Sequence, residues 1–295
     1  MRNIVIFGPT GSGKSQFAET LSQVISCGES ALISADSRQV YRYMDIGTNK
    51  DKPPIKMQSI ILPDQYFSVE DYIENTKPLI KQLNDSGNMA VIVGGTGFYI
   101  TSLVYNMNFG DCPPNFDFRE KLLAKEKIVS GYLWQRLKQL DPAIAKRYNP
   151  KELPRLIRTI EKLEKCPERR EAKVRDENFI TVFLTRERGE LYEMINNRVE
   201  RMIEDGLVDE VKALLKMGYS NSDYGLNGIG YREILKHLAG DCTMIEAVEA
   251  IKQNSRRYAK RQITWRRQLD IDITINLTEK KIEKSIEEVK RYAKN

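Results

Sequence analysis

A stretch of eight residues near the start of the chain has the residue types and spacing of a phosphate-binding loop. Residues 8–15 fit the pattern G-x-x-x-x-G-K-[ST] at every fixed position. In such a loop the backbone N–H groups surround a phosphate, the lysine adds a full positive charge, and the final hydroxyl can bind Mg²⁺. Ser15 is the predicted metal ligand, and the predicted phosphate-binding residues are Gly8, Pro9, Thr10, Gly11, Ser12, Gly13, Lys14 and Ser15.

Two further polar residues follow runs that are typical of buried parallel strands. Residues 31–35 end at Asp36, and residues 90–93 end in a glycine-rich turn that contains Thr96. Ligand chemistry in open α/β sheets gathers at the carboxyl ends of strands. In P-loop ATPases, a carboxylate that holds Mg²⁺ or its water normally follows the second of these strands. This chain has glycines and a threonine there. Hydrolysis of a γ-phosphate would therefore require Asp36 to take over the role of that carboxylate. Thr96 is predicted either to bond a phosphate or acceptor group, or to cap a helix that starts near Tyr99.

Arginines that lie later in the chain could neutralise a bound phosphate. Residues 180–184 predict another buried strand, and Arg188 and Arg198 lie on or beside the long helix that follows it. Either arginine could reach back over the phosphate-binding loop. The alternative for each is an exposed pairing with an acidic residue four positions away. The sequence leaves both interpretations open.

A basic and aromatic stretch near the end of the chain predicts contact with nucleic acid. Residues 252–267 contain seven Lys and Arg residues together with Tyr258 and Trp265, and no Asp or Glu. Cations interleaved with aromatic rings suit phosphate contacts and base stacking. A helix with a merely solvated basic face usually carries balancing acidic residues. We therefore favour a nucleic-acid contact for this stretch.

The elements that must position these groups predict an α/β fold. Residues 3–7 form a short apolar strand before the loop, and apolar residues recur at helical spacing after it. Residues 117–165 have a helical pattern throughout and lie between proline-containing breaks. We predict a P-loop NTPase-like parallel sheet flanked by helices and interrupted by a small all-helical insertion domain. The predicted core spans residues 1–112 and 177–295, and the predicted insertion spans residues 113–176.

Composition narrows the class of protein further. The chain has 295 residues, a formal net charge of +6, one histidine and four cysteines. No C-x-x-C pair occurs, which argues against structural zinc and against a disulfide scaffold. No apolar run approaches the roughly 18 residues that a membrane span needs, and no signal sequence is visible. We therefore expect a soluble cytoplasmic protein in a reducing compartment, with no membrane partner.

These motifs, in this order, resemble the tRNA dimethylallyltransferases of the IPP transferase family, which are also called tRNA isopentenyltransferases. The resemblance extends along nearly the whole chain, and it is more specific than a phosphate-binding loop alone. The matching blocks are residues 8–15, 36–41, 44–48, 94–96, 228–231 and 257–265.

The resemblance implies a reaction and its partners. The family transfers a dimethylallyl group from dimethylallyl diphosphate to N6 of adenine 37, beside the tRNA anticodon, and depends on Mg²⁺. We expect the tRNA anticodon stem-loop as partner and a monomeric enzyme. Asp36 would be the general base, Thr96 would steady Asp36 or a phosphate oxygen, and the loop with Arg188 and Arg198 would hold the diphosphate.

The same resemblance assigns a set of tRNA-binding residues. Ser37 and Gln39 would read the edge of a flipped adenine, and basic residues of the insertion and of the late stretch would contact phosphates. The full set is Asp36, Ser37, Arg38, Gln39, Thr96, Arg119, Arg155, Arg158, Gly230, Tyr231, Arg232, Arg257, Lys260, Arg261 and Gln262.

The chain departs from the family pattern at two places, and other functions remain open. Gln58-Ser59 stands where the family often has two histidines, and Met194 stands where it commonly has an arginine. The alternatives are an adenylate isopentenyltransferase of cytokinin synthesis, a P-loop small-molecule kinase, and an RNA-binding module with a degenerate nucleotide site. An adenylate-specific enzyme needs no basic surface for RNA binding. An RNA-binding module does not need Lys14, Ser15 and Asp36 to be intact.

Overall fold

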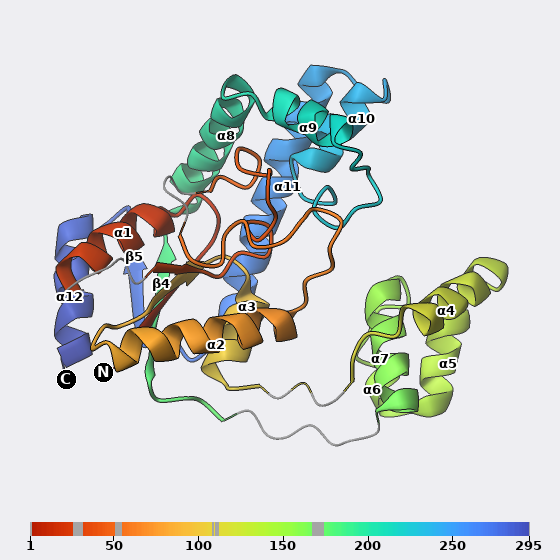
Figure 1. Cartoon of the computed structure of the whole chain (residues 1–295), viewed down its shortest axis with the longest axis horizontal. Coiled ribbons are helices and arrows are strands. Elements are labelled where there is room, and N and C mark those ends of the chain that lie inside the picture. The colour runs from red at the N-terminus through yellow and green to blue at the C-terminus, as the bar shows by residue number, and fades with distance from the viewer. Residues whose placement is uncertain are drawn as a thin grey trace. The chain divides into compact units, whose positions relative to one another are not determined.

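The computed structural model describes residues 2–25, 32–50, 55–107, 109, 112–166 and 174–294 (Figure 1). The chain divides into two compact units, one of residues 1–106 and 174–295 and one of residues 107–173. The boundaries predicted from the sequence lie slightly further along the chain. Cys27 lies outside the described residues. No helix among the described residues is both long and apolar enough to cross a bilayer.

A five-stranded sheet forms the centre of the first unit. Its strand order is β2-β3-β1-β4-β5, and every pairing is parallel. The first strand is fully buried, with Ile4 paired to Val91 on one side and to Ile180 on the other. Because all strands run the same way, their carboxyl ends share one edge. The strands are β1 (Asn3–Phe7), β2 (Leu32–Ser34), β3 (Val91–Gly94), β4 (Phe179–Thr185) and β5 (Ile273–Asn276).

Helices cover this sheet. Figure 1 shows α1 (Lys14–Ile25) beside α12 (Ile282–Lys294), and both pack into one core cluster with the strands. Ile286 and Val289 of α12 are buried in that cluster. Elsewhere in the unit, α2 (Val69–Asp85) packs against α3 (Gly97–Val104), which also contacts β1.

Four helices and a 3₁₀ turn lie beyond the sheet and hold the loop that follows β2. Residues of this loop, such as Met44, pack with Val199, Leu207, Tyr231 and Ile251 in a second core cluster. This packing fixes the polar loop near the carboxyl edge of the sheet. The elements are α8 (Arg188–Glu204), α9 (Leu207–Lys216), α10 (Tyr231–Leu238), α11 (Met244–Trp265) and η1 (Arg266–Gln268).

The second unit is helical, as the sequence predicted. Its helices are α4 (Phe116–Ile128), α5 (Tyr132–Leu140), α6 (Pro142–Ala145) and α7 (Leu153–Lys165). Their apolar faces meet in a small core built around Leu133, Leu137, Leu156 and Ile160, all of which are buried. The predicted α/β core with an all-helical insertion is therefore confirmed.

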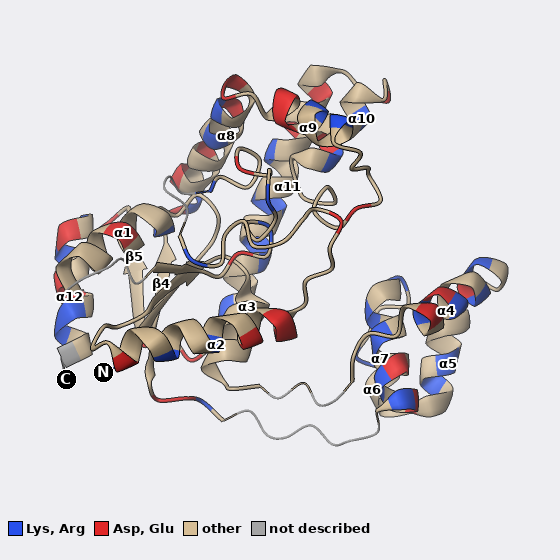
Figure 2. Ribbon diagram, in the orientation of Figure 1, with Lys and Arg blue, Asp and Glu red and all other residues tan. Residues whose placement is uncertain are grey.

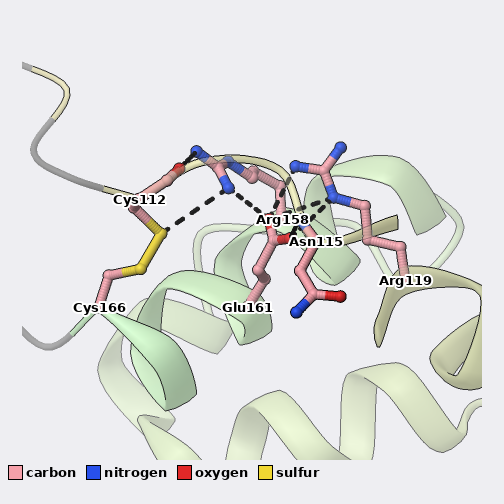
Figure 3. Close-up of a disulfide and its surroundings, with 6 residues drawn as sticks. All are labelled: Cys112, Asn115, Arg119, Arg158, Glu161 and Cys166. Carbon is pink, nitrogen blue, oxygen red and sulfur yellow. Dashed lines mark hydrogen bonds and ion pairs between the residues drawn. A yellow bond between two sulfur atoms is a disulfide. The ribbon is translucent and has the colours of Figure 1, made fainter. Parts of the chain in front are cut away.

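A disulfide closes the helical unit. Cys112 lies shortly before α4 and Cys166 directly follows α7, and the two are bonded across a sequence separation of 54 residues (Figure 3). Their Cα atoms are 5.7 Å apart. The sequence argued against a disulfide scaffold and did not identify this pairing of Cys112 with Cys166. The helical bundle brings its two ends together, and this proximity leaves no signature in the spacing of single cysteines.

Candidate active site

A cavity of about 360 Å³ lies at the carboxyl edge of the sheet. All of its lining residues belong to the first unit. They include Thr10, Lys14 and Ser15 of the predicted phosphate loop, Asp36 after β2, Gly95 after β3, and Arg198 of α8. The fold thus brings together groups that are far apart in the sequence, as the parallel strand order requires.

The phosphate loop has the backbone geometry that its glycines permit. Gly11 and Gly13 have φ angles of 81° and 93°, in the left-handed region that side chains disfavour. A Cβ atom at Gly8 would lie 2.2 Å from the carbonyl oxygen of Leu184 on β4. The loop ends at Lys14, the first residue of α1, so the unpaired N–H groups of that helix point into the loop. This arrangement suits an anion.

Lys14 is held within the loop. Its Nζ donates a hydrogen bond to the carbonyl oxygen of Pro9 at 2.8 Å. Burial, with a further contribution from the nearby Arg198 guanidinium, lowers the pKa of Lys14 to about 7, although Asp36 acts in the opposite direction. A bound anion would replace lost solvation and favour the charged lysine.

We expect the affinity for a diphosphate ligand to fall as the pH rises above about 7. In the free protein Lys14 loses its proton near pH 7, whereas the bound anion requires the charged form, so binding takes up a proton above that pH. The apparent Kd should therefore rise by up to about tenfold per pH unit between about pH 7 and pH 9. Titration of inorganic pyrophosphate across this range measures the slope.

The matched control is Lys14→Arg, whose guanidinium stays charged throughout the range. This variant should bind with little dependence on pH. An equal slope in both proteins would mean that Lys14 is not the titrating group.

Asp36 and Thr96 stand at the ends of neighbouring strands. Asp36 is half-buried, and its Oδ1 accepts a hydrogen bond from the backbone N–H of Arg38 at 2.8 Å. Thr96 Oγ1 accepts the backbone N–H of Ser37 at 2.8 Å, which fixes the residue beside Asp36. Thr96 does occupy the cap position of α3, but its side chain makes no capping hydrogen bond. Its hydroxyl therefore joins the loops after β2 and β3.

The two predicted phosphate-binding arginines occupy different surroundings. Arg198 lines the cavity, and its Nη1 donates to Thr10 Oγ1 at 2.8 Å. Arg188 is exposed and lies over the ring of Tyr192, 5.2 Å from its centroid. Only Arg198 is thus placed at the phosphate loop.

Sequence reasoning missed a third arginine beside the loop. Arg186 Nε donates to the carbonyl oxygen of Ser12 at 3.2 Å, and its guanidinium also pairs with Glu190. Arg186 directly follows β4, whose carboxyl end lies at the same edge of the sheet. This position was the sequence feature that could have identified it. The Arg186 guanidinium thus supports the backbone of the loop, and its pairing with Glu190 holds it in that position.

Gln39 is committed to contacts inside the protein. Its Oε1 accepts hydrogen bonds from Ser34 Oγ at 2.8 Å and from Gln58 Nε2 at 2.9 Å. Its Nε2 donates to the backbone carbonyl of Asn49 at 3.1 Å. The residue lines the cavity, but these contacts use both ends of the amide that was predicted to read a base. Gln58, at one of the departures from the family pattern, is one of its partners.

Tyr231 and Gly230 are structural in this arrangement. Tyr231 is 1% exposed, and its hydroxyl donates to Glu210 Oε1 at 2.6 Å. Burial, followed by the adjacent Glu210 carboxylate, raises the pKa of Tyr231. Gly230 has a φ of 96° where the chain turns into α10. Arg232, the next residue after Tyr231, is exposed and lines the cavity.

Glu210 is a further residue that the sequence did not reveal. Its Oε2 accepts the backbone N–H groups of Asp45 and Ile46, each at 2.7 Å, and its Oε1 accepts that of Gly47 at 3.1 Å. One carboxylate on α9 thus fixes three consecutive residues of the loop that flanks the cavity. Such bonds to a charged acceptor are stronger than neutral ones.

The basic stretch forms the second half of α11 and the turn after it, where Figure 2 shows Lys and Arg along the helix. Three of its seven cations bond other side chains of the protein: Lys252 pairs with Glu200 at 2.9 Å, Arg256 donates to Asn196 at 2.6 Å, and Arg266 donates to Thr274 Oγ1 at 3.0 Å. Five are exposed, namely Arg257, Lys260, Arg261, Arg266 and Arg267. Arg261 also lines the cavity.

The aromatic residues of this stretch anchor the helix to the protein. Tyr258 donates its hydroxyl to the carbonyl oxygen of Gly95 at 3.3 Å, and Trp265 Nε1 donates to Thr101 Oγ1 at 2.9 Å. A Cβ atom at Gly97 would lie 2.2 Å from the Trp265 ring, so the indole packs tightly against α3. These inward contacts do not support the base stacking that the pattern suggested.

In the helical unit, two of the three predicted tRNA-binding arginines surround one buried carboxylate (Figure 3). Glu161 is fully buried and accepts hydrogen bonds from Arg119 at 2.7 Å, from Arg158, and from the backbone N–H of Asn115. Although burial acts to raise it, hydrogen bonds from Arg119 and Arg158 hold the pKa of Glu161 below its usual value. The third arginine, Arg155, is exposed beside Glu152.

The residues of the loop fit a divalent ion only together with a phosphate ligand. No group of three or more His, Cys, Asp or Glu side chains suited to a metal occurs among the described residues. Ser15 is exposed in the first turn of α1 and lines the cavity, as Asp36 also does. Mg²⁺ is commonly held in this way, by few protein oxygens together with phosphate oxygens and water.

Comparisons with known proteins agree on one family. The family model described as IPP transferase matches residues 39–269. A tRNA dimethylallyltransferase of Acetivibrio thermocellus is 42% identical, over 98% of this chain and 96% of the relative. Another, from Thermotoga maritima, is 39% identical, over 94% of this chain and 93% of the relative.

Solved structures give the same result. The full-length tRNA isopentenylpyrophosphate transferase of Bacillus halodurans matches with a TM-score of 0.74 and 34% identity, over 99% of this chain and 95% of the other. A eukaryotic dimethylallyltransferase acting on tRNA matches with a TM-score of 0.82 over 99% of this chain. At 23% identity, this second likeness shows the shared fold alone.

Proposed function

This chain belongs to the IPP transferase family, and from that premise we propose that it transfers a dimethylallyl group from dimethylallyl diphosphate to N6 of adenine 37 in tRNA. The observation that carries the proposal is the single cavity in which the phosphate loop, Asp36 and Arg198 meet. A loop of this type binds the donor through its diphosphate, and the carboxylate serves the acceptor.

The donor half of the site stabilises the leaving group. The allylic C–O bond breaks as the new C–N bond forms, and negative charge accumulates on the departing diphosphate. Loop N–H groups, Lys14 and Arg198 surround the place where this charge develops. Ser15 would hold Mg²⁺, which would supply further positive charge to the diphosphate when bound.

The acceptor half of the site removes a proton. N6 of adenine becomes positively charged as it gains the allyl group, and Asp36 accepts the proton that it loses. Two hydrogen bonds keep this loop in place. Thr96 accepts the backbone N–H of Ser37, and Asp36 accepts that of Arg38. An adenine stacked in the anticodon loop cannot reach a cavity, so it must be flipped out of the stack.

Two alternatives fit the same site less well. A kinase or NTPase would use a carboxylate after β3, where this chain has Gly94 and Gly95 followed by Thr96, which bonds Ser37. An adenylate isopentenyltransferase has a mononucleotide acceptor and would not need the exposed cations of α11. These cations favour a polyanionic acceptor.

A competition among acceptors tests the proposal. Purified protein with Mg²⁺ and labelled dimethylallyl diphosphate is offered an anticodon stem-loop, AMP or ATP. We expect label in the stem-loop alone. Label in AMP but not in RNA would establish the adenylate enzyme, and turnover of ATP without prenyl transfer would establish the kinase.

We expect Arg261→Ala to weaken binding of the anticodon stem-loop and to reduce its dependence on salt. Arg261 is exposed on α11 and also lines the cavity, so it can contact a phosphate near the flipped base. Loss of one phosphate contact should lower the slope of log K against log salt by about one. Binding titrations at several salt concentrations measure this slope.

Arg291→Ala is the matched control, because it removes an exposed arginine from α12. Its slope should equal that of the wild type. If Arg261→Ala also leaves the slope unchanged, Arg261 lies outside the RNA interface.

A further inference from the structure

Gln262 joins α11 to the phosphate loop through both ends of its amide. Its Oε1 accepts the backbone N–H of Thr10 at 2.8 Å, and its Nε2 donates to the carbonyl oxygen of Gly95 at 2.8 Å. The side chain is only 4% exposed, although it was predicted from the sequence to contact tRNA. A donor on one side and an acceptor on the other fix the orientation of the amide.

This amide links three parts of the active site. Thr10 belongs to the phosphate loop, and its hydroxyl accepts the hydrogen bond from Arg198 of α8. Gly95 follows β3 and precedes Thr96, which holds the loop beside Asp36. One side chain of α11 therefore contacts the donor side and the acceptor side of the cavity.

Gln262 is closely packed. A Cβ atom at Gly95 would lie 2.1 Å from Gln262 Nε2, so the amide lies directly against the backbone of that glycine. Tyr258, one helical turn earlier, also donates to the Gly95 carbonyl. The inner face of α11 is thus fitted to the end of β3.

The outer face of the same helical turn carries exposed cations. Lys260 and Arg261 directly precede Gln262, and both are exposed. A polyanion that binds Lys260 and Arg261 would therefore contact the helix directly beside Gln262, the residue that holds the phosphate loop. Because Gln262 occupies the Thr10 N–H, that donor is withheld from the ligand.

We propose that Gln262 is a positioning residue that sets the conformation of the phosphate loop. Through Gln262, diphosphate binding depends on the packing of α11 against this loop. The inference rests on the proposed function for its meaning in catalysis. The claim about the loop itself concerns only the binding of a diphosphate. It can therefore be tested even if the proposed acceptor is wrong.

The test compares Gln262→Met, which keeps the length of the side chain and removes both hydrogen bonds, with Gln253→Met. Gln253 is an exposed residue of the same helix. Inorganic pyrophosphate is titrated against each protein, and the affinity for an anticodon stem-loop is measured separately. We expect Gln262→Met to weaken pyrophosphate binding by about tenfold, with less than a twofold change for the stem-loop, and Gln253→Met to match the wild type.

A folded Gln262→Met protein with the pyrophosphate affinity of the wild type would overturn the inference. A role in folding alone would lower the melting temperature and leave the Kd of the folded protein unchanged, which also contradicts it. If Gln262→Met does not fold, Gln262→Asn takes its place, because the shorter amide can reach only one partner. The expected loss for this variant is smaller, and an unchanged Kd would again refute the proposal.

Discussion

Asp36→Ala is expected to lower kcat for prenyl transfer by about 100-fold or more, while the affinity for the anticodon stem-loop stays nearly intact. Asp36 is the carboxylate at the end of β2 and lies on the wall of the cavity that also holds the phosphate loop. Without it, no carboxylate among the described residues that line the cavity accepts the N6 proton. Single-turnover transfer with saturating donor and stem-loop measures the loss.

Asp36→Asn separates the chemical role from a structural one. The asparagine retains an oxygen that can accept the Arg38 N–H, which Asp36 Oδ1 holds at 2.8 Å, but it has lost the basic carboxylate. We expect it to be as slow as the alanine variant. Recovery of wild-type turnover in Asp36→Asn would mean that the residue supports the loop and is not the base.

Removal of the disulfide is expected to have the largest effect on stability. Replacing Cys112 and Cys166 together by serine opens a loop that spans 54 residues. The chain-entropy estimate for a loop of this size is about 4 kcal/mol of unfolding free energy. This loss should fall on the helical unit, because both cysteines and the helices between them belong to it.

Tryptophan fluorescence can isolate this unit. The chain has two tryptophans, Trp134 in α5 and Trp265 in α11, so a Trp265→Phe background reports on the helical unit alone. Denaturant unfolding should shift to lower concentration in the double serine variant and in the wild type under a reducing agent. The free Cys242 provides the control, since Cys242→Ser should not move the transition. Equal midpoints for oxidised and reduced protein would contradict the prediction.

The sequence predicted the parts of the site that depend on local pattern. The phosphate loop, the strand before Asp36 and the glycine turn after β3 are contiguous motifs, and the parallel sheet brings them to one edge. Arg198 was one of two open candidates, and the structure places it at Thr10. No local feature separates it from Arg188, because the choice depends on which face of α8 meets the loop.

Other assignments could not be made because they depend on distant partners. Arg119 and Arg158 look like free surface cations until Glu161 is known to be buried between them. Gln262 lies in a basic stretch, yet its partners are 252 residues earlier, in the phosphate loop, and 167 residues earlier, directly after β3. The disulfide depends likewise on the folding of the whole helical unit. Such pairings arise from tertiary packing, which single-sequence periodicity does not contain.

The most direct test of the central claim is the transfer of labelled dimethylallyl groups to two anticodon stem-loops that differ only at position 37. One carries adenine and the other carries guanine, which has no exocyclic N6 amine. With Mg²⁺ present, we expect label in the adenine stem-loop and release of diphosphate, and no label in the guanine stem-loop. Equal labelling of both RNAs, or no labelling of either by a protein that binds pyrophosphate, would contradict the proposed function.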